Sequence, residues 1–274
     1  MIQEVYIPKN SQLRQIIRFL YYGEFTNENS FAGTTAIFPN ATTNLTVVLD
    51  HGIDFNQSQL DNAIYATCSS TVLMDTQVGS SFMSAQFNSY GMYFLTGTPV
   101  DEVQDNLMPL HYFFKESAIR RLREQLKSAT SLEARFRKLE CFLLETIQPP
   151  EVDPRLPFGV SMINRDPNLK MDDLSAALCL TNRGMQKLFK KYVGMSPAYF
   201  KKIKRFNHAA KTLLEQPDVP LTSTALNCGY YDQAHFIKDF KHFGQITPSH
   251  FLKLRMKSSD FYNYNLKEME NLTP

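Results

Sequence analysis

Three polar side chains in the second half of the chain share one face of a predicted helix. Gln186 and Lys187 follow Arg183 by three and four residues, which is the spacing of neighbours on a helical surface. The other side of the same segment is apolar, with Met185, Leu188 and Phe189. Arginine and lysine suit the O6 and N7 acceptors of guanine, and glutamine suits adenine. The pattern predicts a helix that reads bases in a DNA groove, and the alternative is a set of ordinary solvated side chains.

A second segment, 51 residues further along the chain, carries a weaker version of this pattern. Its outward positions are Gln233, Ala234, Ile237 and Lys238. Alanine and isoleucine can contact only the methyl groups of thymine. We therefore expect the second helix to depend less on hydrogen bonds to bases than the first helix does.

Hydroxyl and amino groups close to these two helices are candidates for contacts with the phosphates of the same duplex. They are Thr181, Lys190, Lys191, Lys202 and Lys241. Such contacts fix the position of a protein on DNA but carry no sequence information. Each lysine could equally be a charge that only keeps the protein in solution.

The residues around the two helices repeat. Phe189-Lys190-Lys191 precedes Ser196-Pro197, and Phe240-Lys241-His242 precedes Thr247-Pro248, with 51 residues between the copies. A hydroxyl residue before proline supplies an N-cap oxygen and a preset φ, so we expect a helix to begin at each pair. The repeat predicts one supersecondary unit that occurs twice.

Each copy has the features of a helix-turn-helix. Small residues lie where two helices would cross, at Ala225 and Gly229 in the second copy and, less clearly, at Ser175 and Cys179 in the first. The expected caps of the second helices are Thr181 and Asp232. The two copies together are a more specific signal than one alone, because any pair of helices in a small bundle gives a similar pattern.

The segment between the copies is expected to form one continuous helix. From Pro197 to Glu215 it would be about 28 Å long at 1.5 Å per residue. This length is close to the roughly 34 Å turn of B-DNA. A stiff connector of this length can place two helices in successive major grooves.

The formal charge of the chain is unevenly distributed. Residues 155–257 carry a net charge of +10 and residues 1–114 carry −7, although the whole chain carries only +2. A basic block of this size beside an acidic half indicates a module that binds a polyanion, and the alternative on charge alone is a solvated basic surface.

Residues 169–257 resemble the double helix-turn-helix domain of the AraC/XylS family of transcription regulators. The resemblance is carried by LTNRGMQKLFKKYVGMSPAYF, KRFNHAAKTLL and ALNCGYYDQAHFIKDFKHFGQITPSHF. The chain departs from the family at Gln245, where glycine is usual, and at Thr224, where an aliphatic residue is usual. The resemblance implies promoter binding, with the Arg183 face at the base-reading positions.

The first half of the chain has the pattern of strands followed by helices. Residues 1–98 contain runs rich in Val, Thr, Phe and Tyr, punctuated by Gly and Asn. Two stripes with helical spacing follow: Ile119, Leu122 and Leu126, then Leu132, Phe136, Leu139, Leu143 and Ile147. We expect the second stripe to pack on the β-rich half in preference to a second copy of the chain. FPNATTNLTVVLD and AQFNSYGMYFLTGTPVDEVQDNLMPL resemble a cupin-like sensor region often joined to such a module.

Four prolines in QPPEVDPRLP indicate a boundary near Gln148. The predicted fold class is therefore α+β, with two domains. Residues 1–148 would form a β-rich, cupin-like barrel or sandwich with two C-terminal linking helices, for sensing or dimerisation. Residues 155–257 would form an all-α domain with two helix-turn-helix motifs, and residues 258–274 an acidic tail.

The chain has no motif for catalysis, metal or cofactor. Its six histidines form neither H-x-H followed by Glu nor H-E-x-x-H, and neither G-x-S-x-G nor a P-loop is present. We therefore expect no catalytic residue, metal or cofactor. The four cysteines are widely separated, and no run approaches 18 apolar residues. These features predict a cytoplasmic protein with no membrane segment.

The leading interpretation is a transcription regulator that binds double-stranded promoter DNA. A small effector at the β-rich half, RNA polymerase in the case of an activator, and a second copy in a homodimer are the further partners considered. Aromatic residues within 1–114 could line an effector pocket or fill the core between strands. The alternatives are an architectural DNA-binding protein that needs no ligand and a small-molecule enzyme built on the β-rich half.

Overall fold

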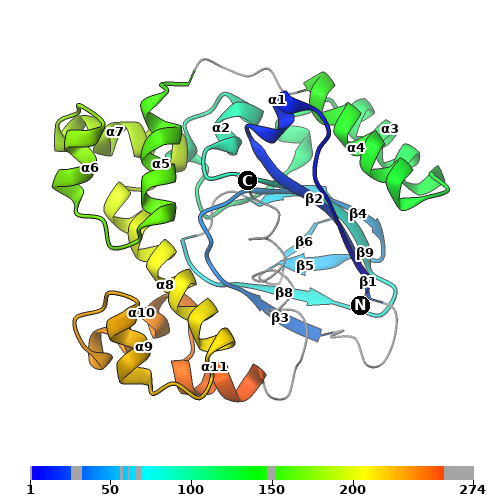
Figure 1. Cartoon of the computed structure of the whole chain (residues 1–274). Coiled ribbons are helices and arrows are strands. Elements are labelled where there is room, and N and C mark those ends of the chain that lie inside the picture. Colours follow the sequence, from blue (N-terminus) through cyan, green and yellow to red (C-terminus); the bar gives the residue numbers. More distant parts are fainter. Residues whose placement is uncertain are drawn as a thin grey trace.

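The computed structural model describes residues 2–25, 33–55, 58–60, 62–65, 69–146 and 152–255. The described residues up to 109 contain two antiparallel sheets, and those from 152 onward form helices (Figure 1). This mixed fold confirms the expected combination of a β-rich half and a helical half. The cupin-like barrel and the predicted domain limits stay predictions. The tail at 258–274 and the proposed boundary residue Gln148 lie outside the described residues, as do Cys68 and Ile147.

The larger sheet has six strands in the spatial order β1-β2-β9-β4-β7-β10. These are β1 (Ile2–Tyr6), β2 (Ile17–Glu24), β9 (Ser81–Phe87), β4 (Asn44–Asp50), β7 (Asn62–Tyr65) and β10 (Leu107–Pro109). The smaller sheet has the order β3-β8-β5-β6. Its strands are β3 (Gly33–Ile37), β8 (Val72–Thr76), β5 (Ile53–Phe55) and β6 (Ser58–Leu60).

Strand β9 lies inside the larger sheet and is buried along its whole length. Met83, Ala85 and Phe87 belong to the core that the sheet shares with helices. Ser84 and Gln86 alternate with them and therefore point to the opposite face. There each forms a side-chain hydrogen bond with a residue of β4. The larger sheet thus has one apolar face and one face with a buried polar row.

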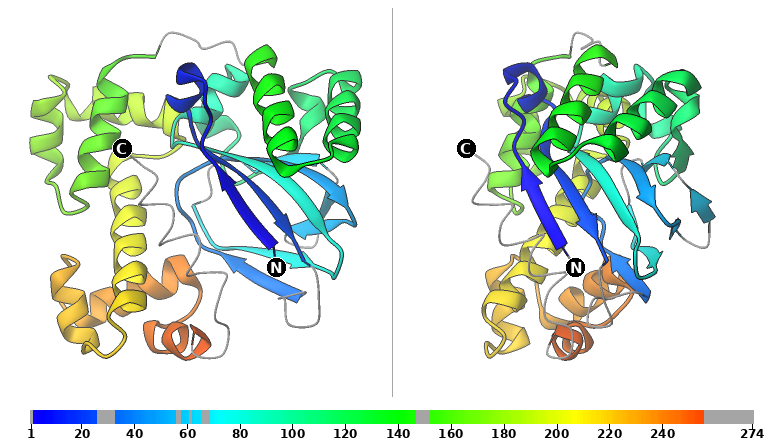
Figure 2. Two further views of the ribbon diagram at one scale, coloured as in Figure 1. Left: turned by 45° about the vertical axis from the view of Figure 1, so that its right-hand side comes forward. Right: turned by 90° about the vertical axis from the view of Figure 1, so that its right-hand side faces the viewer.

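A helical hairpin covers the apolar face (Figure 2). The hairpin consists of α3 (Glu116–Ser128) and α4 (Leu132–Thr146). Four shorter elements lie nearby: the helices α1 (Ser11–Arg14) and α2 (Gly91–Thr96), and the 3-10 helices η1 (Val100–Glu102) and η2 (Leu110–Tyr112). The predicted stripes are buried in the core at Ile119, Leu122, Leu126, Phe136, Leu139 and Leu143. The expected packing of the second stripe on the β-rich half is confirmed for these described members. Phe82 and Phe87 also fill cores, as one of the two interpretations of the aromatic residues proposed.

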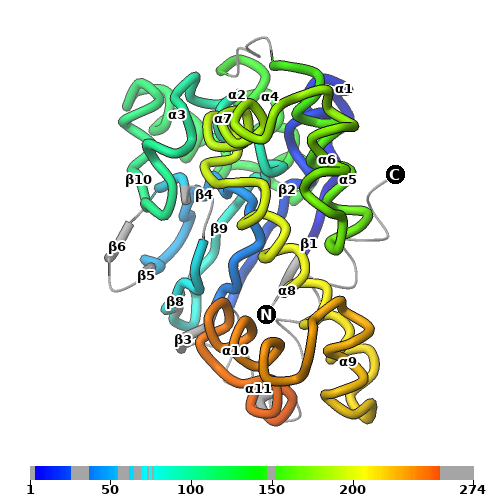
Figure 3. Tube along the Cα trace, turned by 90° about the vertical axis from the view of Figure 1, so that its left-hand side faces the viewer, coloured from blue at the N-terminus to red at the C-terminus, as the bar shows by residue number. Residues whose placement is uncertain are grey.

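Seven helices are described after residue 152. They are α5 (Arg155–Arg165), α6 (Met171–Ala177), α7 (Asn182–Val193), α8 (Pro197–Glu215), α9 (Leu221–Asn227), α10 (Gln233–Gly244) and α11 (Pro248–Arg255). The predicted connector is α8, with proline in its first turn and the Ser196 hydroxyl accepting a hydrogen bond from the Tyr199 amide at 3.2 Å. Figure 3 shows α8 running between α7 at one end and α9 and α10 at the other.

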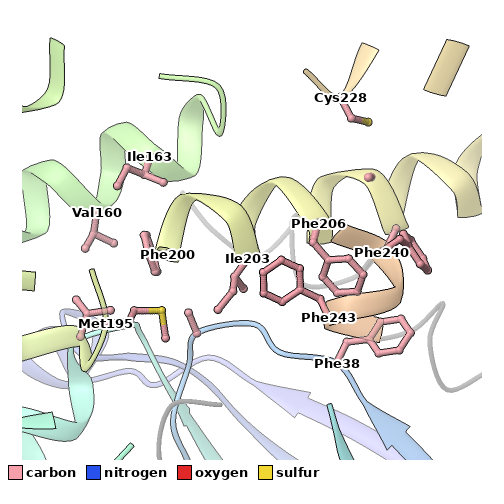
Figure 4. Packing of buried hydrophobic residues seen from close by; sticks show 14 of the residues in the cluster. Phe38, Val160, Ile163, Met195, Phe200, Ile203, Phe206, Cys228, Phe240 and Phe243 are labelled. Carbon is pink, nitrogen blue, oxygen red and sulfur yellow. The ribbon is translucent and has the colours of Figure 1, made fainter. Parts of the chain in front are cut away.

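The core of the helical half includes two residues from the β-rich half, Phe38 and Ala41. Phe38, directly after β3, is 9% exposed and lies in the same apolar cluster as α8, α10 and α11. Its ring centroid is 5.3 Å from that of Phe206, 5.6 Å from that of Phe251 and 6.4 Å from that of Phe240 (Figure 4). The two halves are therefore joined by a shared aromatic core in addition to the chain between them.

An ion pair with little exposure fixes α10 against α8. Arg205 Nη2 on α8 is 3.0 Å from Asp239 Oδ2 on α10, and the side chains are 11% and 12% exposed. The Arg205 guanidinium also lies 4.4 Å from the centroid of the Tyr230 ring. His235 Nε2 is 3.7 Å from the same Asp239 oxygen. The arginine thus connects the connector helix, the turn before α10 and the inner face of α10.

We predict that Asp239→Ala lowers the free energy of unfolding by about 3–5 kcal/mol, because it leaves the Arg205 charge in a desolvated site without its partner. Denaturant titration of the full chain measures the loss. Glu145→Ala is the control, since the Arg121–Glu145 pair is exposed, at 63% and 64%, and such pairs contribute little. Equal unfolding free energies for the two variants would show that the buried pair does not hold α10.

Candidate nucleic-acid interface

The first helix-turn-helix unit consists of α6, a tight turn and α7. The backbone reverses at Cys179, which has a left-handed φ of 51°. The Leu180 amide then donates to the Ser175 carbonyl at 3.0 Å. Thr181 caps α7, as predicted, because its Oγ1 accepts a hydrogen bond from the Gly184 amide at 3.1 Å.

The second unit has the same construction with α9 and α10. Here the left-handed residue is Gly229, with a φ of 77°. The Tyr230 amide donates to the Ala225 carbonyl at 3.0 Å. The predicted cap is again confirmed, because Asp232 Oδ1 accepts from the His235 amide at 2.7 Å.

The turn of the second unit is one residue longer than that of the first. Cys179 and Gly229 are 50 positions apart, whereas the caps Thr181 and Asp232 are 51 positions apart. The additional residue is Tyr231, which is 87% exposed. The predicted 51-residue spacing therefore holds from the caps onward. Before the turns, the predicted counterparts Ser175 and Ala225, and Cys179 and Gly229, are 50 positions apart and occupy equivalent places.

Both departures from the family pattern are accommodated locally. Gln245 ends α10 with a left-handed φ of 58°, in the region where glycine is favoured. Its Nε2 donates to the His242 carbonyl at 2.8 Å. Thr224 is buried, and its hydroxyl lies 3.4 Å from the Pro220 carbonyl as a donor. The two substitutions leave the second unit intact.

The structure brings the three predicted base-reading residues of the first unit to one exposed face. Arg183, Gln186 and Lys187 are exposed on α7, while Met185 and Phe189 are buried behind them. We name α7 the first reading helix and its counterpart α10 the second, after the prediction that they read bases. The exposed face of α7 presents hydrogen-bond donors.

The second reading helix, α10, presents a different face. Ala234 and Lys238 are exposed, and Gln233 and Ile237 are partly exposed. The hydroxyl of Thr222 on α9 lies 2.5 Å from Gln233 Oε1 and donates to it. The predicted residues are thus at the surface, but the Gln233 carbonyl is already engaged inside the unit.

The predicted phosphate contacts have different surroundings. Lys190, Lys202 and Lys241 are exposed, and Thr181 is the helix cap. Lys191 is also exposed, but its Nζ lies 4.9 Å from the ring centroid of Tyr192 and 5.3 Å from that of Tyr93. Since Tyr93 lies on α2, this lysine faces the β-rich half in the present arrangement. Phosphate binding by these residues stays a prediction.

The β-rich half contacts both reading helices at their C-terminal ends. The rings of Tyr93 and Tyr192 are 4.5 Å apart, and the Thr71 hydroxyl donates to the Phe243 carbonyl at 2.5 Å. Gly194 ends α7 with a φ of 85°, which disfavours any other residue, and a Cβ there would make a tight contact of 3.0 Å with the Val100 side chain. The base-reading candidates begin at the other end of each helix, so these contacts leave them at the surface.

Three features of this region were not predicted from the sequence. Tyr231 could have been found by aligning the two turns separately from the caps. The Arg205–Asp239 pair joins residues 34 positions apart on different helices, and no periodicity marks it. Arg18 and Lys204 come from different halves of the chain, and only the fold brings them close.

The described part of the chain contains no cluster of three or more His, Cys, Asp and Glu side chains that could hold a metal ion. Within the same residues, every helix is too short or too polar to cross a membrane.

Comparison with known proteins agrees with the geometry of the two units. Residues 174–254 match the helix-turn-helix domain family. An uncharacterised HTH-type transcriptional regulator of Haemophilus influenzae is 31% identical over 103 residues, which are 37% of this chain and 34% of that protein. The HTH-type transcriptional regulator ArgR of Pseudomonas aeruginosa is 26% identical over 97 residues, which are 35% of this chain and 29% of ArgR. The chain thus spans about a third of the length of these relatives, both of which are named as transcriptional regulators.

Solved structures give matches of two extents. A probable AraC family transcriptional regulator from Rhodopseudomonas palustris has a TM-score of 0.34 and 27% identity, over 37% of this chain and 97% of that one. ToxT from Vibrio cholerae has a TM-score of 0.47 and 12% identity, over 92% of this chain and 98% of that one.

The family match covers both capped units and the connector between them. Its limits lie within the residues that carry the sequence resemblance. Residues 174–254 therefore form a helix-turn-helix domain with two units, in agreement with the resemblance of residues 169–257 to the AraC/XylS pattern.

Proposed function

We propose that the chain is a transcription regulator that binds promoter DNA with α7 and α10 in successive major grooves. The observation that carries the proposal is the pair of capped helices with free N-terminal faces, held apart by the 19-residue helix α8. A helix of this length spans about 28 Å, near the roughly 34 Å between successive major grooves on one side of a duplex. The high positive charge of residues 155–257 supports the same partner.

Selection of duplexes from a random pool tests the proposal. We expect a consensus with two short half-sites whose centres are about ten base pairs apart. Binding without any consensus would favour the architectural alternative. Failure to bind any duplex would overturn both.

We predict that binding of the selected duplex weakens steeply between 50 and 200 mM salt. Each neutralised phosphate adds about 0.9 to the slope of log K against log salt concentration. Fluorescence anisotropy with a labelled duplex measures this slope. A slope near zero would contradict a role for the basic half in DNA binding.

We predict that Arg183→Ala or Lys187→Ala costs about 1–3 kcal/mol on the selected duplex and relaxes the preference at one or two positions. The reason is that these exposed side chains are placed to hydrogen-bond base edges. Competition between the selected and a scrambled duplex measures the lost discrimination.

Lys190→Ala is the matched control for these variants. It lies on the same helix and is exposed, but we assign it to phosphate. It should weaken both duplexes similarly and reduce the salt slope by about one. Equal losses on both duplexes for Arg183→Ala would show that Arg183 positions the protein without reading bases.

We further propose that an anionic effector controls the contact between the two halves. Arg18 on β2 donates to Gln86 Oε1 at 3.2 Å, and Gln86 belongs to the polar row of the larger sheet. Lys204 on α8 donates to the Asn40 carbonyl at 2.9 Å. Among the described residues, neither cation forms an ion pair. Two half-buried cations from different halves suit a small organic acid, because its carboxylate would supply the missing charge.

The surroundings of Lys204 give this effector site a pH signature. Burial, together with the nearby charge of Arg18, lowers the pKa of Lys204 to about 7 from 10.5. Between these pH values the unfolded chain therefore binds a proton that the folded chain lacks. This contribution makes stability rise with pH across that window.

We predict that Lys204→Met makes the free energy of unfolding less dependent on pH between about 7 and 10, because the group with the lowered pKa is gone. Lys202→Met, at an exposed position of the same helix, is the control and should keep the wild-type slope. A panel of small carboxylic acids, added in thermal melts, should stabilise wild type and Lys202→Met more than Lys204→Met. Unchanged pH slopes would contradict the lowered pKa of Lys204, and equal stabilisation by the acids would contradict the effector site.

A homodimer, a contact with RNA polymerase and a cytoplasmic location stay predictions.

A further inference from the structure

The second unit exposes apolar side chains where it would approach DNA. Tyr231 in the turn is 87% exposed, and Leu226 on α9 is 56% exposed. In the first turn and a half of α10, Ala234 is exposed and Ile237 is partly exposed. Counting from the two caps, Ala234 and Ile237 stand where the first unit has Arg183 and Gln186. The second unit therefore replaces two hydrogen-bonding side chains with apolar ones.

The polar groups around this surface are largely engaged within the protein. The Gln233 carbonyl accepts from Thr222, and the Asp232 carboxylate caps the helix through the His235 amide. Asp239 faces Arg205 on the inner side of α10. The Asp232 carboxylate also makes a poor neighbour for a phosphate, since both are negative. Hydrogen bonding to bases is thus left mainly to Lys238 and the Gln233 amide nitrogen.

We infer that the second unit recognises its half-site through the 5-methyl groups of thymine, with Ile237 and Ala234 in the major groove and Tyr231 packed beside them at its edge. The inference rests on the proposed function and names the chemistry that one half of the site reads. Thymine is the base that offers an apolar group in the major groove. Tyr231, the extra residue of the longer turn, supplies the third apolar side chain of this contact.

The test replaces thymine by uracil, which removes the methyl group and leaves the base pairing unchanged. It uses the full chain and the duplex recovered by selection. The half-site at which Arg183→Ala loses discrimination belongs to α7, so the other half-site belongs to α10. Uracil at the thymines of the α10 half-site should weaken binding about fourfold per contacted methyl, the value for burying one methyl-sized group. Uracil in the α7 half-site should change binding much less.

Variants then assign the methyl contacts to residues. Ile237→Ala and Tyr231→Ala should each bind the thymine duplex more weakly and lose part of the preference for thymine over uracil. Tyr112→Ala is the control for removal of a surface tyrosine, because Tyr112 is 67% exposed on η2 of the β-rich half. It should keep the full preference, and so should Arg183→Ala at the α10 half-site. Thermal melts of each variant confirm that it remains folded.

The outcomes separate the inference from the proposed function. Tight, salt-dependent binding that is indifferent to uracil, or a selected α10 half-site without thymine, would overturn the inference and leave the regulator proposal standing. A preference for thymine that survives in both Ile237→Ala and Tyr231→Ala would also overturn it, since other residues would then read the methyl groups. Absence of binding to any duplex would overturn the proposed function and the inference together.

Discussion

The separation between the two reading helices depends on one stiff element, α8. Its ends are defined by local chemistry, with the Ser196 cap and a proline at the start. Its buried residues, among them Phe200, Ile203 and Phe206, lie in the common core of both units. A bend in α8 would therefore open that core and misplace α7 and α10 at the same time. The same helix places Arg205 against α10 and Lys204 against the β-rich half. The orientation of the second unit and the contact between the halves therefore both depend on the position of α8.

The sequence predicted the DNA-binding region well because its signals are local. Caps at Thr181, Ser196 and Asp232 follow from side-chain oxygens placed one residue before a helix, and the inward positions follow from the helical period. The apolar stripes were predicted for the same reason, and their members Ile119, Leu122, Leu126, Phe136, Leu139 and Leu143 are buried. One local feature was missed, since the extra residue of the second turn, Tyr231, was not singled out between the residues of the helix crossing and the cap.

The order of the strands and the docking of the halves could not be predicted in this way. Strands β2 and β9 are neighbours although some sixty residues separate them, and only the complete sheet decides which alternate face is apolar. The buried polar row at Ser84 and Gln86 could not be predicted from the sequence, because the residues that form hydrogen bonds with it lie on β4 and β2. Likewise nothing in the sequence distinguishes Arg18 and Lys204 from other basic residues, because only the fold brings β2 and α8 close enough for the two charges to interact.

The position of Phe38 limits how the helical half could be moved from this chain to another one. A module that folds around its own core can be moved between chains with little more than a linker. Here one ring of the helical core belongs to the β-rich half, so a transplanted helical half would carry an aromatic socket with nothing to fill it. Recombination would then succeed only with donors whose β-rich half supplies a similar ring. The two halves are therefore complementary in shape at this ring, and a change in one constrains the side chains that the other can carry there.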